Sequence, residues 1–410
     1  MKKITKKALK SREKLRVGIL GATGIVGQRF ISLLENHPWF NVVVLAASPQ
    51  SAGKKYGEVM KGSPARPNEL GHSGRWVMKT PIPEKTKNII IKAVEEDFDK
   101  IVKEVDLVFS AIDIDPVRNS SPIGPSGALR AGVISNGVDK KDKNQLIREI
   151  EERYAAAGVA VVSNNSAHRW TDDVPMIMPE LNADHLDIID IQRKNRGWKK
   201  GLLVVKPNCS LQSYLPVIYA LKKFGPEIVS VTTLQAISGA GKTFETWPEM
   251  VDNCIPFIGG EEEKTEKEPL KILGSIKGKK IVPDKKLNIS ATCIRVACSN
   301  GHMASVAVKF KKKPTKEQII EAIKNFKNPL AGLDLPSAPK QFIKYFSEDN
   351  RPQTKLDRDY ENGMGITCGR FREDSVLGWK FIALSHNTIR GAAGGAILIA
   401  ELLYKKGYLN

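Results

Sequence analysis

One cysteine stands where a helix can raise its reactivity. Cys209 lies in the run KPNCSLQSYLPVIYALKKFG, where Pro207 and Asn208 predict the stop and cap of a helix with Cys209 in its first turn. The unpaired N–H groups and the dipole at a helix N-terminus favour a thiolate. They contribute at most ~2 kcal/mol, which leaves a thiol of ordinary pKa, roughly 8.5, only partly ionised near neutral pH. The segment therefore predicts a cysteine nucleophile that still needs a base.

The candidate base is His302, in the segment CIRVACSNGHMASVAV. Asn300-Gly301 is typical of a two-residue hairpin turn, which would place His302 opposite Ser299. Arg295, four residues before Ser299, would share that face by strand alternation. An imidazole and a guanidinium would then point into one pocket. An incidental loop histidine and a surface arginine are the alternative interpretation.

A glycine-rich turn near the start of the chain is suited to phosphate. Residues 15–20 (LRVGIL) predict a buried strand, and QRFISLLEN predicts a helix soon after it. The glycines between them depart from the strict G-x-G-x-x-G fingerprint, but a turn between a strand and a helix N-terminus favours a pyrophosphate. A tight turn without a ligand is the alternative. The expected cofactor-binding residues are Gly21, Ala22, Thr23, Gly24, Ile25, Val26 and Gly27.

The end of the next apolar strand, residues 41–48, indicates the kind of dinucleotide. NAD-specific sites usually place Asp or Glu there, on the ribose hydroxyls. This chain has Ser48 and Ser51, with Lys54 and Lys55 just beyond and no carboxylate between them. Hydroxyls and cations suit a 2′-phosphate, so the sequence favours NADP.

Alternating strands and helices up to about residue 205 predict an α/β domain, a Rossmann-type doubly wound parallel sheet. From residue 228 longer alternating strands predict a second, α+β domain with a mixed sheet, and residues 259–274 predict a charged helix. Further strands of the two sheets are expected at 106–112, 133–137, 159–166, 228–237, 287–298 and 302–311.

These patterns divide the chain into three parts. We expect a basic tail at 1–14, an NADP-binding domain at 15–205 and a catalytic and dimerisation domain at 206–385. A glycine-rich, then apolar C-terminal helix, 386–410, would complete the first domain.

The composition is that of a globular enzyme. At 410 residues, with 41% apolar and 27% charged side chains, the chain is long enough for two domains. No apolar run approaches the ~18 residues that span a bilayer. Five cysteines at scattered positions form neither a disulfide framework nor a paired metal-ligand spacing. We therefore expect a cytoplasmic protein with no membrane partner and no metal.

The net charge of +19 raises the alternative of a nucleic-acid-binding protein. Residues 1–14 hold seven Lys or Arg against Glu13 alone, so the tail supplies +6 of this charge. The remaining excess is spread thinly and lacks the interleaved aromatic residues of a single-strand binder. A basic surface that meets a phosphorylated substrate and cofactor explains the charge with fewer assumptions.

Five motifs run in order from about residue 15 to 400: GATGIVG, NNSAHRWTDDVPMIMPELN, PNCS, LQAISGAG and R-x-x-x-x-x-x-H. In these motifs the sequence resembles the aspartate-semialdehyde dehydrogenase family, and in loop shape its archaeal and fungal branch. The resemblance implies NADPH-dependent reductive dephosphorylation of L-aspartyl-4-phosphate to L-aspartate 4-semialdehyde, with release of inorganic phosphate. It also implies a homodimer or homotetramer and a place in the biosynthesis of lysine, methionine, threonine and isoleucine.

The resemblance also implies roles for single residues. Cys209 would form the thioester and His302 would act as acid and base. Gln235 would orient the substrate, Arg295 would bind its α-carboxylate and Glu261 its α-ammonium group. The remaining residues that it implies are Arg169, Lys264 and Asn208 for the phosphate, and Ser238, Gly239 and Asn387 for the cofactor.

Two other functions compete with this one. An acyl-CoA reductase on the same scaffold, such as a malonyl-CoA reductase, would share the cysteine, the histidine and an arginine, but would not require Glu261 for an ammonium group. A nucleic-acid-binding or redox-sensing protein on a nucleotide-binding fold is the more remote alternative.

Overall fold

The computed structural model describes residues 13–61, 75–113 and 140–409. The predicted basic tail, except for its last two residues, and the predicted strand at 133–137 lie outside the described residues. In the part that is described, no helix is long and apolar enough to cross a membrane.

The N-terminal half contains a six-stranded parallel sheet in the order β3-β2-β1-β4-β5-β6, the doubly wound order of a Rossmann fold. Every residue of β4, β5 and β6 is buried, as expected of parallel strands covered on both faces. The strands are β1 (Leu15–Leu20), β2 (Phe40–Ala47), β3 (Lys92–Ala93), β4 (Leu107–Ser110), β5 (Ala160–Ser163) and β6 (Leu202–Val205).

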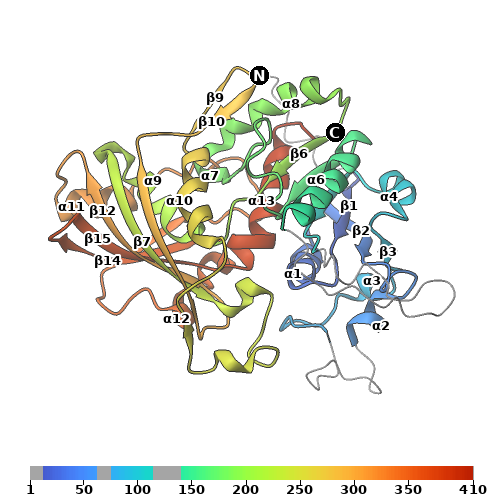
Figure 1. The fold of residues 1–410 in the computed structure, drawn as a ribbon, viewed down its shortest axis with the longest axis horizontal. Coiled ribbons are helices and arrows are strands. Elements are labelled where there is room, and N and C mark those ends of the chain that lie inside the picture. The colour runs from blue at the N-terminus through green and yellow to red at the C-terminus, as the bar shows by residue number, and fades with distance from the viewer. Residues whose placement is uncertain (1–12, 62–74, 114–139, 410) are drawn as a thin grey trace, which may run out of the picture.

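Helices connect these strands and cover the sheet (Figure 1). They are α1 (Ile25–Leu34), α2 (Tyr56–Lys61), α3 (Glu84–Lys87), α4 (Phe98–Glu104), α6 (Lys140–Ala156), α7 (Pro179–Asn182), η2 (Ala183–Ile188) and α8 (Ile189–Arg196).

The second sheet has seven strands in the order β13-β14-β15-β12-β7-β11-β8. It is mixed, because β7 pairs in parallel with β11 and antiparallel with β12. The predicted fold class is therefore confirmed, whereas the division of the chain at residue 205 remains a prediction. The strands are β7 (Pro226–Ala236), β8 (Cys254–Ile255), β11 (Asn288–Val296), β12 (His302–Phe310), β13 (Ile343–Phe346), β14 (Ile366–Asp374) and β15 (Gly378–Ser385).

The predicted Asn300-Gly301 hairpin is wrong. β11 and β12 do not pair with each other, because β7 lies between them and pairs with both. The connection from β11 to β12 therefore spans the width of one strand and is not a tight turn. A local turn signal could not reveal this, since the intervening strand comes some fifty residues earlier in the chain.

Helices α9 (Leu211–Ala220) and α10 (Glu261–Ile272) pack on one face of the mixed sheet. α9 is buried along most of its length, from Leu211 to Ile218. The predicted charged helix at 259–274 is α10, which begins with three glutamates that suit the positive end of its dipole. The other elements of this half are η3 (Lys222–Phe224), η4 (Ile237–Ala240), η5 (Pro248–Met250), β9 (Ser275–Lys277), β10 (Lys280–Val282), α11 (Lys316–Lys324), α12 (Thr354–Asp357) and η6 (Tyr360–Gly363).

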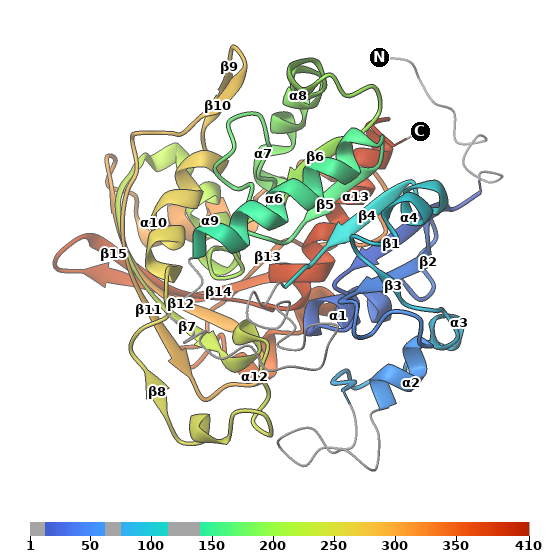
Figure 2. The same ribbon diagram turned by 45° about the vertical axis from the view of Figure 1, so that its right-hand side comes forward.

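The C-terminal segment joins the two halves. After β15 the chain forms a π-helical turn, η7 (Ile389–Ala393), and the apolar helix α13 (Gly394–Lys405). α13 contacts α1, β5 and α7 of the first half, and in both views it lies between the two sheets (Figures 1 and 2). Helix α13 thus packs on the N-terminal half, although along the chain it follows the last strand of the mixed sheet.

Candidate active site

Cys209 lies in the turn between β6 and α9, at the carboxyl edge of the parallel sheet. The helix begins at Leu211, so the prediction that Cys209 lies inside the first turn is wrong by two residues. Asn208 is not the helix cap as predicted, because Ser210 holds that position; instead Asn208 Oδ1 closes a turn around Cys209 by accepting hydrogen bonds from Ser210 N at 2.7 Å and Ser210 Oγ at 2.8 Å. The thiol is therefore held just outside the helix by a closed polar turn.

One face of α10 holds this turn. Glu261 accepts two hydrogen bonds of 2.9 Å from the Asn208 side chain, and Thr265 Oγ1 lies 3.1 Å from Ser210 Oγ. One turn further on, Glu268 Oε2 accepts a 2.6 Å hydrogen bond from the backbone N of Asn208. Positions i, i+4 and i+7 of a helix share a face, so these contacts fix the backbone on either side of Cys209.

Glu268 also binds Arg169. Its Oε1 accepts a 2.7 Å hydrogen bond from Arg169 Nη1, and both side chains are buried. Arg169 Nη2 donates to Asn164 O at 3.1 Å, while its Nε is buried without a partner among the described residues. The arginine is thus fixed in place by two hydrogen bonds, and its Nε–H is left without a partner in the part of the chain that is described.

Three predicted residues form a row across three adjacent strands. Gln235 on β7 is the register partner of Arg295 on β11 and of His302 on β12, so all three side chains share one face of the sheet. Gln235 Nε2 donates to Glu261 Oε2 at 3.3 Å, which links the row to α10. The sequence predicted that Arg295 and His302 would share a face, but not that Gln235 would separate them.

A backbone N–H group of the adjacent strand β7 orients His302. Ala236 N donates to His302 Nδ1 at 3.1 Å, so the neutral ring carries its proton on Nε2. Nε2 is buried and lacks a partner in the described part of the chain. A Cβ added to Gly239 would lie 3.1 Å from Nε2 and 2.8 Å from Arg295 Nη1, so this glycine keeps the space beside both groups open.

The same charged residues affect the pKa values of Cys209 and His302. Burial and then Glu261 raise the pKa of Cys209 to about 11, although Lys206, Arg169 and Arg295 act in the opposite direction. Burial and then Arg295 lower the pKa of His302 to about 3; Lys206 acts in the same direction, whereas Glu261 opposes the shift. Asn208, next to Cys209, and Gln235, the register partner of His302, both bond to Glu261, so the thiol and the imidazole belong to one site.

The prediction that the helix would lower the thiol pKa is therefore wrong. Burial of the thiol, although Cys209 keeps some exposed surface, disfavours the thiolate more than the nearby cations favour it. For Glu261 the interactions that favour the charged form outweigh the effect of burial. Burial raises the pKa of that carboxyl, but Lys264 and the hydrogen bonds from Asn208 and Gln235 bring it below its ordinary value.

A pH dependence of thiol reactivity follows from the raised pKa of Cys209, about 11. Only the thiolate reacts with iodoacetamide, so below the pKa the alkylation rate of Cys209 should rise about tenfold per pH unit. The rise should continue from about pH 7 to about pH 10, which mass spectrometry of the Cys209 peptide would follow. A plateau already at pH 8 would contradict the enclosed, neutral thiol.

The glycine turn has the shape required for a phosphate. Gly21 has φ of +86°, and an added Cβ would lie 2.2 Å from Ala111 O. A Cβ on Gly27 would lie 2.2 Å from Gly21 O, so both glycines are required by close packing. Gly24 meets nothing nearer than 3.6 Å and precedes α1 without a side-chain cap. The first N–H groups of α1 therefore face an open approach for an anion.

The other predicted cofactor residues lie at separate places around the turn. Ser48, at the end of β2, is exposed, and Ser51 is buried, with its backbone N bonded to Ser48 O. Asn387 donates to Ser238 Oγ at 2.9 Å and accepts from Gly301 N at 2.8 Å. Asn387 thus connects η4 with the start of β12. No group of three His, Cys, Asp or Glu side chains arranged for a metal occurs among the described residues.

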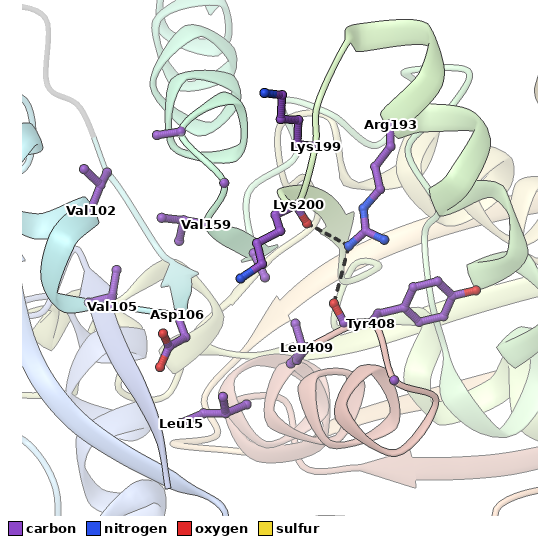
Figure 3. A pocket seen from close by; sticks show the side chains of 14 residues that line it. Leu15, Val102, Val105, Asp106, Val159, Arg193, Lys199, Lys200, Tyr408 and Leu409 are labelled. Atoms are coloured by element: carbon purple, nitrogen blue, oxygen red, sulfur yellow. Dashed lines mark hydrogen bonds between the residues drawn. The ribbon is translucent and has the colours of Figure 1, made fainter. Parts of the chain in front are cut away.

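A separate cavity of about 350 Å³ lies at the opposite edge of the parallel sheet (Figure 3). It is lined by residues at the starts of β1, β4 and β5, whereas open α/β sheets bind ligands at the carboxyl ends of their strands. The Arg193 side chain in this cavity already donates hydrogen bonds to the carbonyl oxygens of Lys200 and Tyr408. This cavity does not contain the predicted site residues.

Sequence reasoning missed Glu268, Thr265 and Lys206. Thr265 and Glu268 could have been found from α10 itself, since they lie four and seven residues after Glu261 on a helix already predicted. Lys206 stands three residues before Cys209, where the strand ends, and carried no recognisable signal.

Comparisons with known proteins place the chain in a family. Residues 16–123 and 143–189 match the family "Semialdehyde dehydrogenase, NAD binding domain", and residues 216–390 match "Semialdehyde dehydrogenase, dimerisation domain". The chain is 40% identical to the aspartate-semialdehyde dehydrogenase of Archaeoglobus fulgidus, over 95% of this chain and 98% of the relative. It is 37% identical to that of Saccharomyces cerevisiae, over 96% and 98%.

A solved structure is similar over almost the whole chain. The crystal structure of aspartate-semialdehyde dehydrogenase with NADP from Candida albicans has a TM-score of 0.77 and 34% identity, covering 97% of this chain and 100% of that one. A Vibrio cholerae structure with 23% identity and a TM-score of 0.67 has the same fold.

Proposed function

The chain belongs to the aspartate-semialdehyde dehydrogenase family, and we propose that it reduces L-aspartyl-4-phosphate to L-aspartate 4-semialdehyde through a thioester on Cys209. The observation that carries this proposal is the row Arg295–Gln235–His302, which faces the same buried site as Cys209 and Glu261. A nucleophile, a proton carrier and two opposite charges thus meet where one small zwitterionic substrate can touch all of them.

The two charges match the two ends of the amino acid. Arg295 would bind the α-carboxylate, since its Nη1 is anchored on Ala236 O at 2.7 Å and the planar guanidinium suits a bidentate partner. Glu261 would bind the α-ammonium group, which its ionised carboxylate supports. Gln235 would orient the substrate between them. Glu261 is already bonded to Asn208, Gln235 and Lys264, so the substrate would join an existing network.

Phosphate would be held by Arg169, Lys264 and Asn208. The unpartnered Nε of Arg169 and the partly exposed ammonium of Lys264 support this role. Both lie next to the turn that carries Cys209, through Glu268 and Glu261 respectively. Attack of the thiolate on the acyl carbon would break the carbon–oxygen bond to phosphate and leave a thioester.

His302 would move the protons. Its imidazole is neutral, and Nε2–H is buried beside Gly239 without a partner among the described residues. An anionic acyl phosphate would raise the pKa of the ring toward the range of acid–base catalysis, so that the ring could take the thiol proton. It would return that proton to the carbonyl oxygen when the thioester is reduced.

The cofactor would be NADP, which supplies the hydride that reduces the thioester. The open N-terminus of α1 after Gly24 fits the pyrophosphate, and the absence of a carboxylate at 48–51 fits the 2′-phosphate. Ser48 and Ser51 would bind near that phosphate. Asn387, with Ser238 and Gly239 beside it, would bind the nicotinamide amide, which its position between η4 and β12 supports.

The assembly would be a cytoplasmic homodimer or homotetramer. The match to a dimerisation domain supports a homo-oligomer. On the face of the mixed sheet away from Cys209, the register neighbours Leu234, Ile294 and Met303 are apolar and only partly covered. Such a face is suited to a second copy of the chain.

A direct assay separates this function from the acyl-CoA alternative. The protein should reduce NADP with aspartate semialdehyde only when inorganic phosphate is present, and should be inactive with malonyl-CoA and NADPH. Activity with malonyl-CoA alone would overturn the proposed substrate.

Glu268→Gln tests the phosphate site. The amide can still accept from Asn208 N, but it no longer balances the charge of Arg169, so the arginine should lose its fixed position. We expect the KM for phosphate to rise about tenfold, with the KM for NADP unchanged. Glu263→Gln is the matched control, since Glu263 lies on the solvent face of the same helix. Equal effects of the two variants would contradict this role of Glu268.

A further inference from the structure

A buried lysine near the nucleophile has no carboxylate partner. Lys206 follows β6, and its side chain is 2% exposed. Its Nζ donates to the carbonyl oxygen of Pro207 at 2.5 Å, and it takes part in none of the ion pairs found among the described residues. Burying an ammonium group without a counter-charge is costly, so such a group needs an anion at some stage.

The other buried cations around the site already have partners. Arg169 is paired with Glu268, and Arg390 forms a bidentate pair with Glu180. Lys271, also buried, donates to three backbone carbonyl oxygens and lies on the far end of α10. Lys206 differs from all of these, because one carbonyl oxygen satisfies only one of its three donors.

Two glycines of the C-terminal segment lie against Cys209 and Lys206. A Cβ on Gly391 would lie 2.7 Å from the Cβ of Cys209, and a Cβ on Gly395 would lie 3.2 Å from Cε of Lys206. These glycines are four residues apart, where η7 passes into α13. The backbone of one segment thus covers part of both side chains, which leaves Lys206 buried and Cys209 partly exposed.

We propose that Lys206 is the cation that stabilises the Cys209 thiolate. The sequence distance of three residues, the shared cover of Gly391 and Gly395 and the absence of a carboxylate on Nζ carry this assignment. Lys206 is therefore a positioning residue for the proposed reaction, because it acts on the reaction only by stabilising the negative charge on the Cys209 sulfur. The inference rests on the proposed function of Cys209 as the nucleophile.

The charges that face this pair come from several elements. Glu261 and Glu268 of α10 are negative, while Arg169, Arg295 of β11 and Arg390 of η7 are positive. Burial lowers the pKa of Lys206 to about 7, and among its charge interactions the one with Cys209 comes first and opposes this shift. The thiolate form of Cys209 and the ammonium form of Lys206 therefore stabilise each other.

Alkylation of Cys209 in the free protein tests the assignment without turnover. At about pH 6, below the pKa of Lys206, Lys206→Met should lower the iodoacetamide rate on Cys209 about tenfold, which equals a thiolate less favoured by about one pH unit; the difference should fade above about pH 8, where the ammonium has lost its proton. Lys206→Arg should keep the rate within about threefold of the natural protein, because it keeps the charge. Lys271→Met is the matched control: it removes another buried lysine and should lower stability with no effect on the alkylation rate.

An unchanged pH–rate profile in Lys206→Met would overturn the proposal. If the KM for phosphate also rises in that variant, the ammonium is assigned to the substrate instead. If Lys206→Met does not fold, Lys206→Gln compared with Lys206→Arg gives the same test. Turnover retained in Cys209→Ser would instead sink the proposed function itself, so the two failures are distinguishable.

Discussion

Cys209→Ser is expected to lower kcat by about 10⁴-fold or more while NADP binding stays unchanged. A serine hydroxyl is far harder to ionise than a thiol, and the enclosed turn that already raises the pKa of Cys209 would disfavour an alkoxide still more. The ester that serine could form would also be reduced less readily than a thioester. Steady-state rates with aspartate semialdehyde and phosphate, together with NADP titration by fluorescence, measure both parts.

The matched control is Cys254→Ser, at an exposed cysteine on β8. It should leave kcat unchanged, because this thiol has no contact with the row Arg295–Gln235–His302. Mass spectrometry gives an independent measurement: the natural protein mixed with substrate should carry an acyl group on the Cys209 peptide alone. An adduct on another cysteine, or turnover retained in Cys209→Ser, would remove the covalent mechanism.

The fold was predictable because the signals that define it are local. β1, the glycine turn and α1 appear in sequence as an apolar run, closely spaced glycines and a periodic helix, and the structure has them in that order. The long strands β7, β11 and β12 were found from their alternation, because one face is buried and the other is not.

The order of the strands could not be predicted in the same way. Asn300-Gly301 is a strong local hairpin signal, yet the pairing of β11 and β12 with β7 is decided by side chains far apart in the chain. Where tertiary pairing competes with a turn preference of this size, pairing prevails. The functional consequence is small, since Arg295 and His302 still share a face, with Gln235 between them.

The candidate site was predicted residue by residue only where a motif existed. Cys209 and His302 were visible as reactive types in typical settings. Glu268 and Lys206 were not, because their importance comes from burial and from partners that the sequence does not place beside them. The reactivity of Cys209 was misjudged for a related reason: the helix dipole is visible in sequence, but the desolvation that outweighs it is not.

His302→Asn is expected to lower kcat by about 10³-fold, the range in which a positioned proton carrier contributes. Asparagine can place its Oδ1 where Nδ1 accepts the hydrogen bond from Ala236, so the strand should keep its geometry. It lacks a group at the position of Nε2, the atom without a partner that faces the pocket. The loss should therefore fall on proton transfer, with the KM for NADP unchanged.

His302→Gln makes the test sharper, because its amide reaches toward the Nε2 position and can donate a hydrogen bond but cannot exchange a proton. If His302 only positions the substrate by donating, Gln should recover most of the activity that Asn loses. If it transfers a proton, both variants should be equally slow and the pH dependence of kcat should flatten. His185→Asn is the control: His185 is buried and bonded to Asn182 and Gly274 O, so its loss should affect stability alone. Recovery of activity in His302→Gln would reduce His302 from an acid–base catalyst to a hydrogen-bond donor.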